Sequence, residues 1–459
     1  MPPVRRRPAP RSSAAALCPR RTVWPARPTV WATRGRRWDD RRRADDRLDV
    51  TINGTVLTDD ALAAVFSRLP GVADVVRCAA TCRRWGRLVA DRGRALARAL
   101  PPTGRPLPRL ALGVFHQEND APTARTRRSA AAAAAAPPRF APMESAAALR
   151  PLIGSHGDHG IFRNSLPVAS RNGRLVLELQ REAHADGLRL CVCDPLSGDA
   201  AMLPALSGGE KPRDYRCAVL TGDDLDPRPR SLASFRVLLL YTRRGLTALR
   251  CYSSDAGRWG PEADAGVRVS GWKLRQIGPA VVRRGVAFWP LDHGALGVRV
   301  SAGAAAAPEI TETHLVPYLP HYWPAVRLLG VRPDDERLFF VHFGVCWLGY
   351  LLARVAYFEI DGDDLRSGRK LRCTTEDTIP MPQLRVRCQD MDTLKLRWVC
   401  ERSGVLLFTL GESSGCSGTF ALNLWDRVLE KVADGEGDAW RNFVGYEMGM
   451  ASYLAAIAP

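Results

Sequence analysis

The chain has 459 residues and a formal net charge of +18, and it is long enough for two or three domains with a sizeable core. Apolar residues make up 46% and charged residues 25%, values typical of globular proteins. Half of the net charge lies in residues 1–50, which hold fourteen Arg and five Asp, and no basic stripe is interleaved with aromatic residues. The composition therefore argues against a folded face that binds nucleic acid.

Residues 1–50 are rich in Arg and Pro and show no sustained hydrophobic period, so we expect a disordered arm. The first 38 residues contain ten Arg and no acidic residue, which also fits a transit peptide, and a short basic nuclear signal is a third interpretation. An arm that binds nucleic acid is the alternative function for the chain.

The cysteine pattern argues against a secreted, disulfide-bonded protein, and the longest apolar run argues against a membrane-spanning one. The twelve cysteines are spread singly apart from Cys191 and Cys193, no C-x-x-C pair occurs, and no secretory signal opens the chain. We therefore expect free thiols in a reducing compartment, the cytoplasm and/or the nucleus. The apolar run at 338–353 is shorter than the roughly 20 residues of a membrane helix, so we expect two buried strands there and no membrane partner.

Residues 51–100 form a compact helical domain. Thr58 is placed to cap the first helix, while Asp59 and Asp60 favour the positive end of its dipole. An apolar stripe at helical spacing runs along this helix to Pro70, and a second helix continues the spacing. The stripes are Leu62, Val65, Phe66 and Leu69, then Val72, Val75, Val76, Ala79, Cys82, Trp85 and Val89. So small a domain cannot bury this apolar surface alone, so we expect a partner chain to cover part of it.

Residues 101–163 read as a linker with a low-complexity insert of seven consecutive alanines. Residues 164–459 show the pattern of antiparallel hairpins, including the runs GWKLRQI (271–277) and DTLKLRWV (392–399). Turn glycines at 173, 245, 285 and 404 are spaced near multiples of about 40 residues, the period of propeller blades. This spacing predicts six or seven blades, with a β-sandwich pair as the alternative, and the RLALGVF strand (109–115) is expected to join the C-terminal region.

The fold class is therefore α+β multidomain, with a small N-terminal helical domain followed by an all-β, propeller-like C-terminal domain. Residues 57–93, LTDDALAAVFSRLPGVADVVRCAATCRRWGRLVADRG, resemble an F-box, the motif that docks the Skp-type adaptor of cullin–RING ubiquitin ligases. The family's opening Leu-Pro-Asp-Asp appears as LTDD (57–60), its central Leu-Pro as residues 69–70, and its Val-Cys-basic-basic-Trp as TCRRW (81–85).

The resemblance implies a set of adaptor-binding residues: Leu57, Thr58, Leu62, Val65, Phe66, Leu69, Pro70, Val76, Cys82 and Trp85. Thr58 stands where the family has proline, which removes part of a docking contact, and Thr81 stands where the family has valine. The later segments LCVCDPLSGDAAMLP and GPAVVRRGVAFWPL resemble the β-rich associated domain of a large group of plant F-box proteins, which implies recruitment of a target protein. The expected function is a substrate-recruiting subunit of a Skp–cullin–F-box ubiquitin ligase, with the target and its modification state left open.

Candidate catalytic and metal sites were weighed and set aside. Ser413 lies in a G-x-S-x-G match, but a nucleophile elbow leads into a helix and needs a later His, whereas the last histidine is His342. A serine hydrolase is therefore the less favoured alternative. His156 and His159 have no further Cys or His nearby to complete a zinc site, and the pair Asp223-Asp224 reads as a turn. We expect no catalytic residue, no metal site and no cofactor.

Overall fold

The structure is a computed structural model, and the chain divides into two compact units, residues 1–58 and 59–459. In the first unit, β1 (Thr51–Ile52) and β2 (Thr55–Val56) pair as an antiparallel hairpin. The expected arm and the alanine run lie outside the described residues. The structure describes residues 51–52, 55–100, 110–117, 137–149, 161–163, 165–179, 187–206, 212, 214–222, 224–225, 234–243, 245–291, 294–300, 310–317, 328–332, 336–358, 373–411, 416–434 and 440–456.

Four short helices open the second unit and are together called the helical block: α1 (Asp59–Phe66), α2 (Val72–Ala79), α3 (Arg83–Asp91) and α4 (Gly93–Ala99). The expectation of one continuous helix after Pro70 was wrong. Cys82 adopts an extended conformation with φ −152° and ψ 162°, which ends the helical path and starts α3 in a new direction. Because of this break, α3 packs against both α1 and α2.

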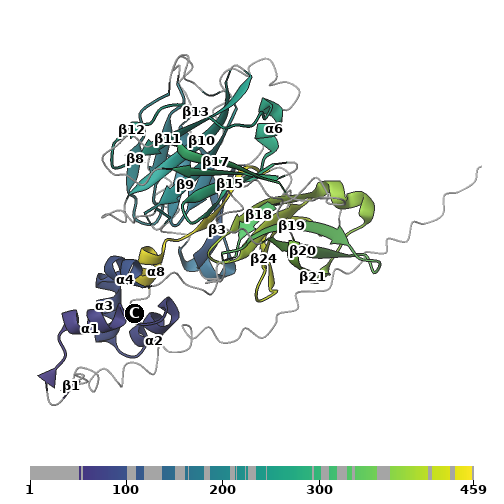
Figure 1. Cartoon of the computed structure of the whole chain (residues 1–459). Helices are drawn as coiled ribbons and strands as arrows, with labels where there is room; N and C mark the ends of the chain where they lie inside the picture. The colour runs from purple at the N-terminus through teal and green to yellow at the C-terminus, as the bar shows by residue number, and fades with distance from the viewer. Residues whose placement is uncertain are drawn as a thin grey trace, which may run out of the picture. The chain divides into compact units, whose positions relative to one another are not determined.

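Six antiparallel sheets form the rest of the unit as the blades of a propeller-like domain (Figure 1). Blade 1 is β5 (Ser165–Arg171), β6 (Arg174–Leu179), β7 (Leu190–Cys193) and β8 (Ala200–Met202), and blade 2 is β9 (Tyr215–Thr221), β10 (Phe235–Arg243), β11 (Leu246–Ser253), β12 (Arg258–Trp259) and β13 (Ala263–Asp264). Blade 3 is β14 (Val281–Arg283), β15 (Val286–Leu291), β16 (Gly294–Val300) and β17 (Ile310–Pro317), and blade 4 is β18 (Leu328–Val331), β19 (Leu338–Val345), β20 (Tyr350–Phe358) and β21 (Cys373–Arg385). Blade 5 is β22 (Leu394–Cys400), β23 (Val405–Leu410), β24 (Gly418–Asn423) and β25 (Leu429–Ala433), and blade 6 is β26 (Arg441–Glu447), β3 (Ala111–Gln117) and β4 (Arg139–Pro142).

The first strands of the blades contact one another around the ring, with β26 against β5, β5 against β9, β14 against β18, β18 against β22 and β22 against β26. They begin at intervals of 47 to 66 residues, so the expected unit of about 40 residues was wrong even though the count of six blades falls in the predicted range. The four glycines do occupy hairpin turns at positive φ, but Gly245 joins the second and third strands of its blade whereas Gly173 joins the first and second. Their spacing therefore did not measure the blade repeat.

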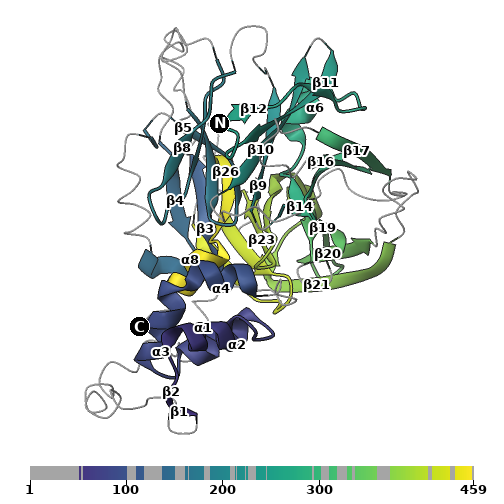
Figure 2. The same ribbon diagram turned by 60° about the vertical axis from the view of Figure 1, so that its left-hand side comes forward.

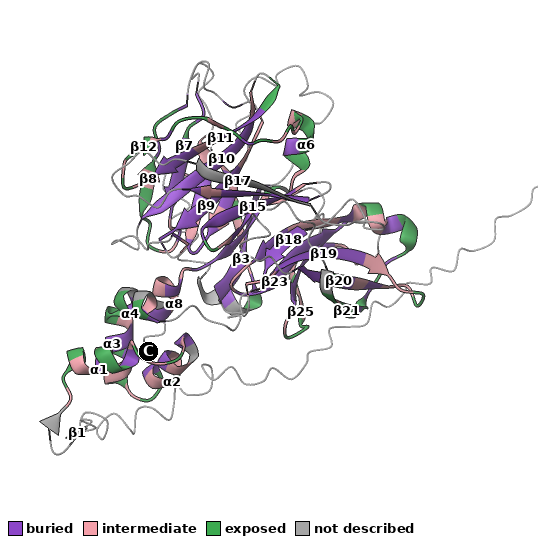
Figure 3. Cartoon of the chain, in the orientation of Figure 1, coloured by how far each residue is buried: buried purple, intermediate pink, exposed green. Residues whose placement is uncertain are grey.

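Continuous apolar strands are explained by burial on both faces. In β10, Val237, Leu239 and Tyr241 pack in the cluster shared with blade 1, whereas Leu238 and Leu240 pack in the cluster shared with blade 3. Alternate side chains of a strand point to opposite faces, so a strand between two blades is apolar at nearly every position. The run at 338–353 follows the same rule and forms the hairpin β19–β20, as predicted. Figure 3 shows the blade strands largely buried and α6 (Gly271–Gln276) mostly exposed, although Leu274 of this helix is buried.

Blade 6 closes the ring with segments from both ends of the unit. Its first strand, β26, pairs with β3, which in turn pairs with β4. The segment expected as a linker, 101–163, thus contributes two strands to the propeller, and the RLALGVF segment joins the C-terminal region as predicted. GWKLRQI, expected as a strand, is instead the helix α6, while most of DTLKLRWV forms β22 as expected.

The helix α8 (Met450–Ala456) follows β26 and packs against α3 and α4 of the helical block (Figure 2). Leu454 of α8 and Leu96 of α4 are fully buried. Within about fifteen residues, the C-terminal segment therefore supplies the first strand of blade 6 and a helix that packs against the helical block.

Candidate functional site

The helical block buries part of the predicted adaptor-binding set. Leu62 and Phe66 lie on the inner face of α1, and the Phe66 ring meets the half-buried Trp85 ring edge-on with centroids 5.2 Å apart. Apolar residues in such contacts stabilise the domain itself by about 2–5 kcal/mol each. Leu62, Phe66 and Trp85 are therefore part of the core of the helical block.

The outer face of α1 and the turn after it carry the other part of that set. Val65 is 52% exposed, Leu69 is half-buried and Pro70 is exposed. Leu69 donates its backbone N–H to the carbonyl of Phe66, a tight turn that ends the helix just before proline removes the next donor. Val76 and Cys82 are half-buried; Leu57, half-buried, and Thr58, exposed, belong to the first unit. The structure thus divides the stripe into an inner pair and an outer pair.

Two ion pairs join the start of α1 to the later helices. Asp59 accepts hydrogen bonds from Arg84, with the closest N–O distance 2.9 Å, and Asp60 accepts one from Arg92 at 2.7 Å. All four side chains are at least partly exposed, so each pair contributes at most about 1 kcal/mol. Arg84 of the TCRRW motif thus forms an ion pair within the helical block, a role that the sequence did not indicate.

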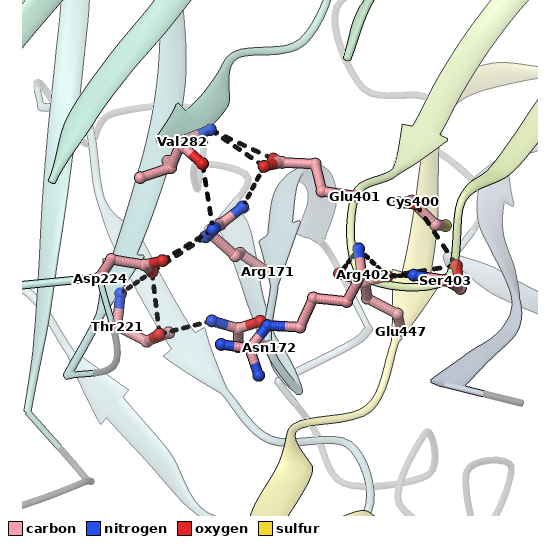
Figure 4. A network of polar contacts seen from close by, with 10 residues as sticks. All are labelled: Arg171, Asn172, Thr221, Asp224, Val282, Cys400, Glu401, Arg402, Ser403 and Glu447. Atoms are coloured by element: carbon pink, nitrogen blue, oxygen red, sulfur yellow. Dashed lines mark hydrogen bonds and ion pairs between the residues drawn. The ribbon is translucent and has the colours of Figure 1, made fainter. Parts of the chain in front are cut away.

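A buried polar network lies where the first strands of several blades end (Figure 4). Arg171, at the end of β5, pairs with Asp224 of blade 2 at 2.7 Å and with Glu401, just after β22, at 2.6 Å. Glu401 also accepts the backbone N–H of Val282 in blade 3 at 3.1 Å. The Arg171 guanidinium therefore links blades 1, 2, 3 and 5 through charge-assisted bonds.

A third carboxylate completes this network. Glu447, at the end of β26, accepts backbone N–H groups of Arg402 and Ser403 at 3.3–3.4 Å. Burial raises the pKa of Glu447 above its ordinary value and raises the pKa of Glu401 to about 7. Burial also acts to raise the pKa of Asp224, but the charge of Arg171 and the hydrogen bonds to this carboxylate outweigh it, so the pKa of Asp224 is lowered. Asp224, expected only as a turn residue, is therefore an inter-blade ion partner that lies far in sequence from Arg171.

A pocket of about 480 Å³ lies where the same first strands begin. Its described lining comes from strands of blades 1, 2, 4, 5 and 6 and includes Pro167, Arg216, Leu328, Arg397 and Phe443. Residues preceding β14, among them Ile277, complete the wall. A cavity of this size with mixed apolar and polar walls has the character of a binding site.

The sequence did not single out Arg216 or Arg397. Each is a charged residue inside an apolar strand, in YRCAVLT and LKLRWVC. An arginine in a strand that is otherwise buried is the one signal that could have marked them. Of the tryptophans, Trp398 lines the pocket and Trp289 is fully buried, whereas Trp347 is 91% exposed at the β19–β20 turn.

Most residues of the other candidate sites are not among those that the structure describes. Ser413, His156, His159 and Asp223 lie outside the described residues. Across the described ranges, no group of three His, Cys, Asp or Glu side chains is arranged to hold a metal ion. The described helices include none that has the length and hydropathy to cross a bilayer.

Comparison with known proteins assigns the helical block. Residues 59–96, which run from the first residue of α1 into α4, match the F-box-like family model. No curated protein matches the sequence. The chain therefore carries an F-box-like region at 59–96, and a six-blade, all-β propeller-like domain follows it.

Proposed function

We propose that this protein is the substrate-recruiting subunit of a Skp–cullin–F-box type ubiquitin ligase. The observation that carries the proposal is the F-box-like match at 59–96, because F-box domains generally bind Skp-type adaptors. The outer residues Val65, Leu69 and Pro70 supply apolar surface for such a partner, and a helix-in-groove contact uses residues of this kind. The propeller-like domain holds the target protein and, in this proposal, catalyses no reaction and needs no cofactor.

The proposal extends to the cell compartment and to the adaptor-binding residues. Ten described cysteines are free thiols, which supports a reducing cytoplasm or nucleus. Thr58, where the family has proline, weakens the adaptor contact, so Leu69 and Pro70 carry a larger share of it. The resemblance to plant F-box proteins with a β-rich domain supports target recruitment by blades 1–6.

Adaptor binding tests the proposal. Changing Leu69→Ala and Pro70→Ala together removes outer surface without touching the buried Leu62 and Phe66. We expect a loss of about 2 kcal/mol or more, which is roughly a thirtyfold weaker Kd for a Skp-type adaptor, measured by pull-down and titration.

A matched control removes exposed apolar surface elsewhere. Trp347→Ala with Leu348→Ala strips the β19–β20 turn, where both side chains are exposed, and leaves adaptor affinity unchanged. Circular dichroism verifies that both double variants keep the β domain folded. Adaptor binding that survives the Leu69/Pro70 change would sink the proposal.

A further inference from the structure

Arg216, at the start of β9, is a half-buried cation without a carboxylate partner among the described residues. Its Nε donates to the carbonyl of Ile277 at 2.8 Å, and its Nη2 donates to the carbonyl of Arg275. Burial lowers the pKa of Arg216, and the only group that opposes this shift is the phenol of Tyr215. A partly desolvated charge that bonds only neutral carbonyls is unfavourable, and an anion in the pocket would offset that cost.

The remaining charges of the pocket do not neutralise Arg216. Glu178 accepts the phenol O–H of Tyr215 at 2.6 Å, and Arg275 pairs with Asp214 at 2.6 Å near the rim. Arg397, on β22, adds a third guanidinium to the lining and lies 5.6 Å from the centre of the Phe443 ring. With Asp214 counted as the partner of Arg275, three arginines stand against two carboxylates at the pocket, which leaves a small excess of positive charge.

We propose that this axial pocket binds an acidic, extended segment of the target protein, with Asp or Glu carboxylates pairing with Arg216 and Arg397. The inference rests on the proposed function, because it names the chemistry of the target that the β domain recruits. Arginine presents a planar fork that matches a carboxylate with two parallel hydrogen bonds.

The rest of the lining favours a peptide as the source of the carboxylates. Leu166, Pro167, Leu396, Trp398 and Phe443 contribute apolar and aromatic side chains to the lining. Side chains of an extended peptide alternate, so acidic residues can reach the arginines while their neighbours contact these walls. An inorganic anion would leave this apolar surface uncovered.

Binding of defined peptides to the full-length chain tests the proposal. The probes are a fluorescein-labelled peptide in which Glu alternates with Ser, the same peptide with Gln for Glu, and the Gln peptide with its serines phosphorylated. Fluorescence anisotropy should show the Glu peptide binding at least about tenfold more tightly than the Gln peptide, and less tightly as salt rises. Equal binding of the Glu and Gln peptides, or binding of the phosphorylated peptide alone, overturns the proposal.

Variants locate the binding in the pocket. Arg216→Gln and, separately, Arg397→Gln should each weaken the Glu peptide about tenfold, and Arg216→Lys should weaken it less than Arg216→Gln. Arg258→Gln removes the same charge from exposed β12 and should leave binding unchanged. Two results count against the pocket: an equal loss in Arg258→Gln, or full binding by a folded Arg397→Gln protein.

Adaptor titration on the same proteins separates this inference from the proposed function. The pocket variants should bind the Skp-type adaptor as the unchanged chain does. A chain that binds adaptor but ignores the Glu peptide refutes the pocket proposal alone. A chain that binds the Glu peptide through Arg216 but never binds adaptor refutes the ligase proposal alone.

Discussion

The helical block and the propeller-like domain differ in how completely their helices and strands bury apolar residues. In the blades, a strand such as β10 is covered on both faces, so that Val237 to Tyr241 are all fully buried. In the helical block, α1 buries Leu62 and Phe66 but leaves Val65 52% exposed, and Leu69 is only half-buried. The blade strands are therefore covered by neighbouring blades, whereas α1 leaves apolar surface exposed, which the proposed adaptor would cover.

The comparison has one exception, which is the C-terminal segment. β26 lies in the ring and α8 lies against α3 and α4, so both regions depend on residues 440–456.

Deleting residues 440–459 should have the largest effect. The deletion removes β26 together with its buried Val444 and Tyr446 and leaves β3 without its inner neighbour. We expect a loss of more than about 5 kcal/mol, enough to unfold a domain of ordinary stability. Deleting only 450–459 should spare the ring and loosen the helical block, and an unchanged melting temperature in the longer deletion would contradict the ring closure.

Arg171→Met should destabilise the propeller by about 4 kcal/mol, because it leaves Asp224 and Glu401 buried without their cation. Urea denaturation followed by tryptophan fluorescence measures the loss. Arg258→Met, on the exposed edge strand β12, provides the control and should change stability by less than about 0.5 kcal/mol. Similar midpoints for the two variants would mean that the network does not hold the blades together.

Phe66→Ala should remove about 3 kcal/mol from the helical block, since the ring is fully buried and packs on Trp85. The neighbouring Val65→Ala should cost less than about 0.5 kcal/mol because Val65 is exposed. Hydrogen exchange resolves the two regions, with faster exchange expected in α1–α3 and not in the blades. Equal costs at 65 and 66 would refute the division of α1 into an inner and an outer face.

The stability of the propeller should fall as pH rises from 5 to 8. The pKa of Glu401 is about 7 in the folded protein, whereas an unperturbed Glu, as in the unfolded chain, has a pKa of 4.5. Between pH 4.5 and pH 7 the folded state therefore holds a proton that the unfolded state has lost. Such a shift corresponds to about 3 kcal/mol at most, fully present below pH 4.5 and lost as pH passes 7. Asp224 acts in the opposite direction, but only at acid pH below this window, because its pKa is lowered.

Glu401→Gln isolates that contribution. The amide resembles the protonated acid, so the variant should match the unchanged protein at pH 5 and become the more stable of the two at pH 8. Urea midpoints at both pH values measure the difference. A parallel decline in both proteins would assign the pH dependence to other groups, Glu447 among them.

Local patterns accounted for much of the molecule. Helical spacing and Pro70 placed α1, the turn glycines placed hairpins at Gly173, Gly285 and Gly404, and the apolar run at 338–353 predicted the hairpin β19–β20. The same patterns failed where a local signal was ambiguous. GWKLRQI has no strict alternation and became α6, and the helical spacing from Val72 to Trp85 hid the extended residue Cys82.

By itself, the sequence determined α1, several of the hairpins and the place of the F-box-like region, because capping, turn and periodicity signals act between residues close in the chain. Only the tertiary structure decided which stripe residues of α1 face inward and that β26 closes the ring on β3. It also decided that Arg171 meets Asp224 and Glu401, and that Arg216 and Arg397 share a pocket. These pairs are separated by tens to hundreds of residues, and without homologous sequences no local pattern specifies which distant strand ends meet at the axis.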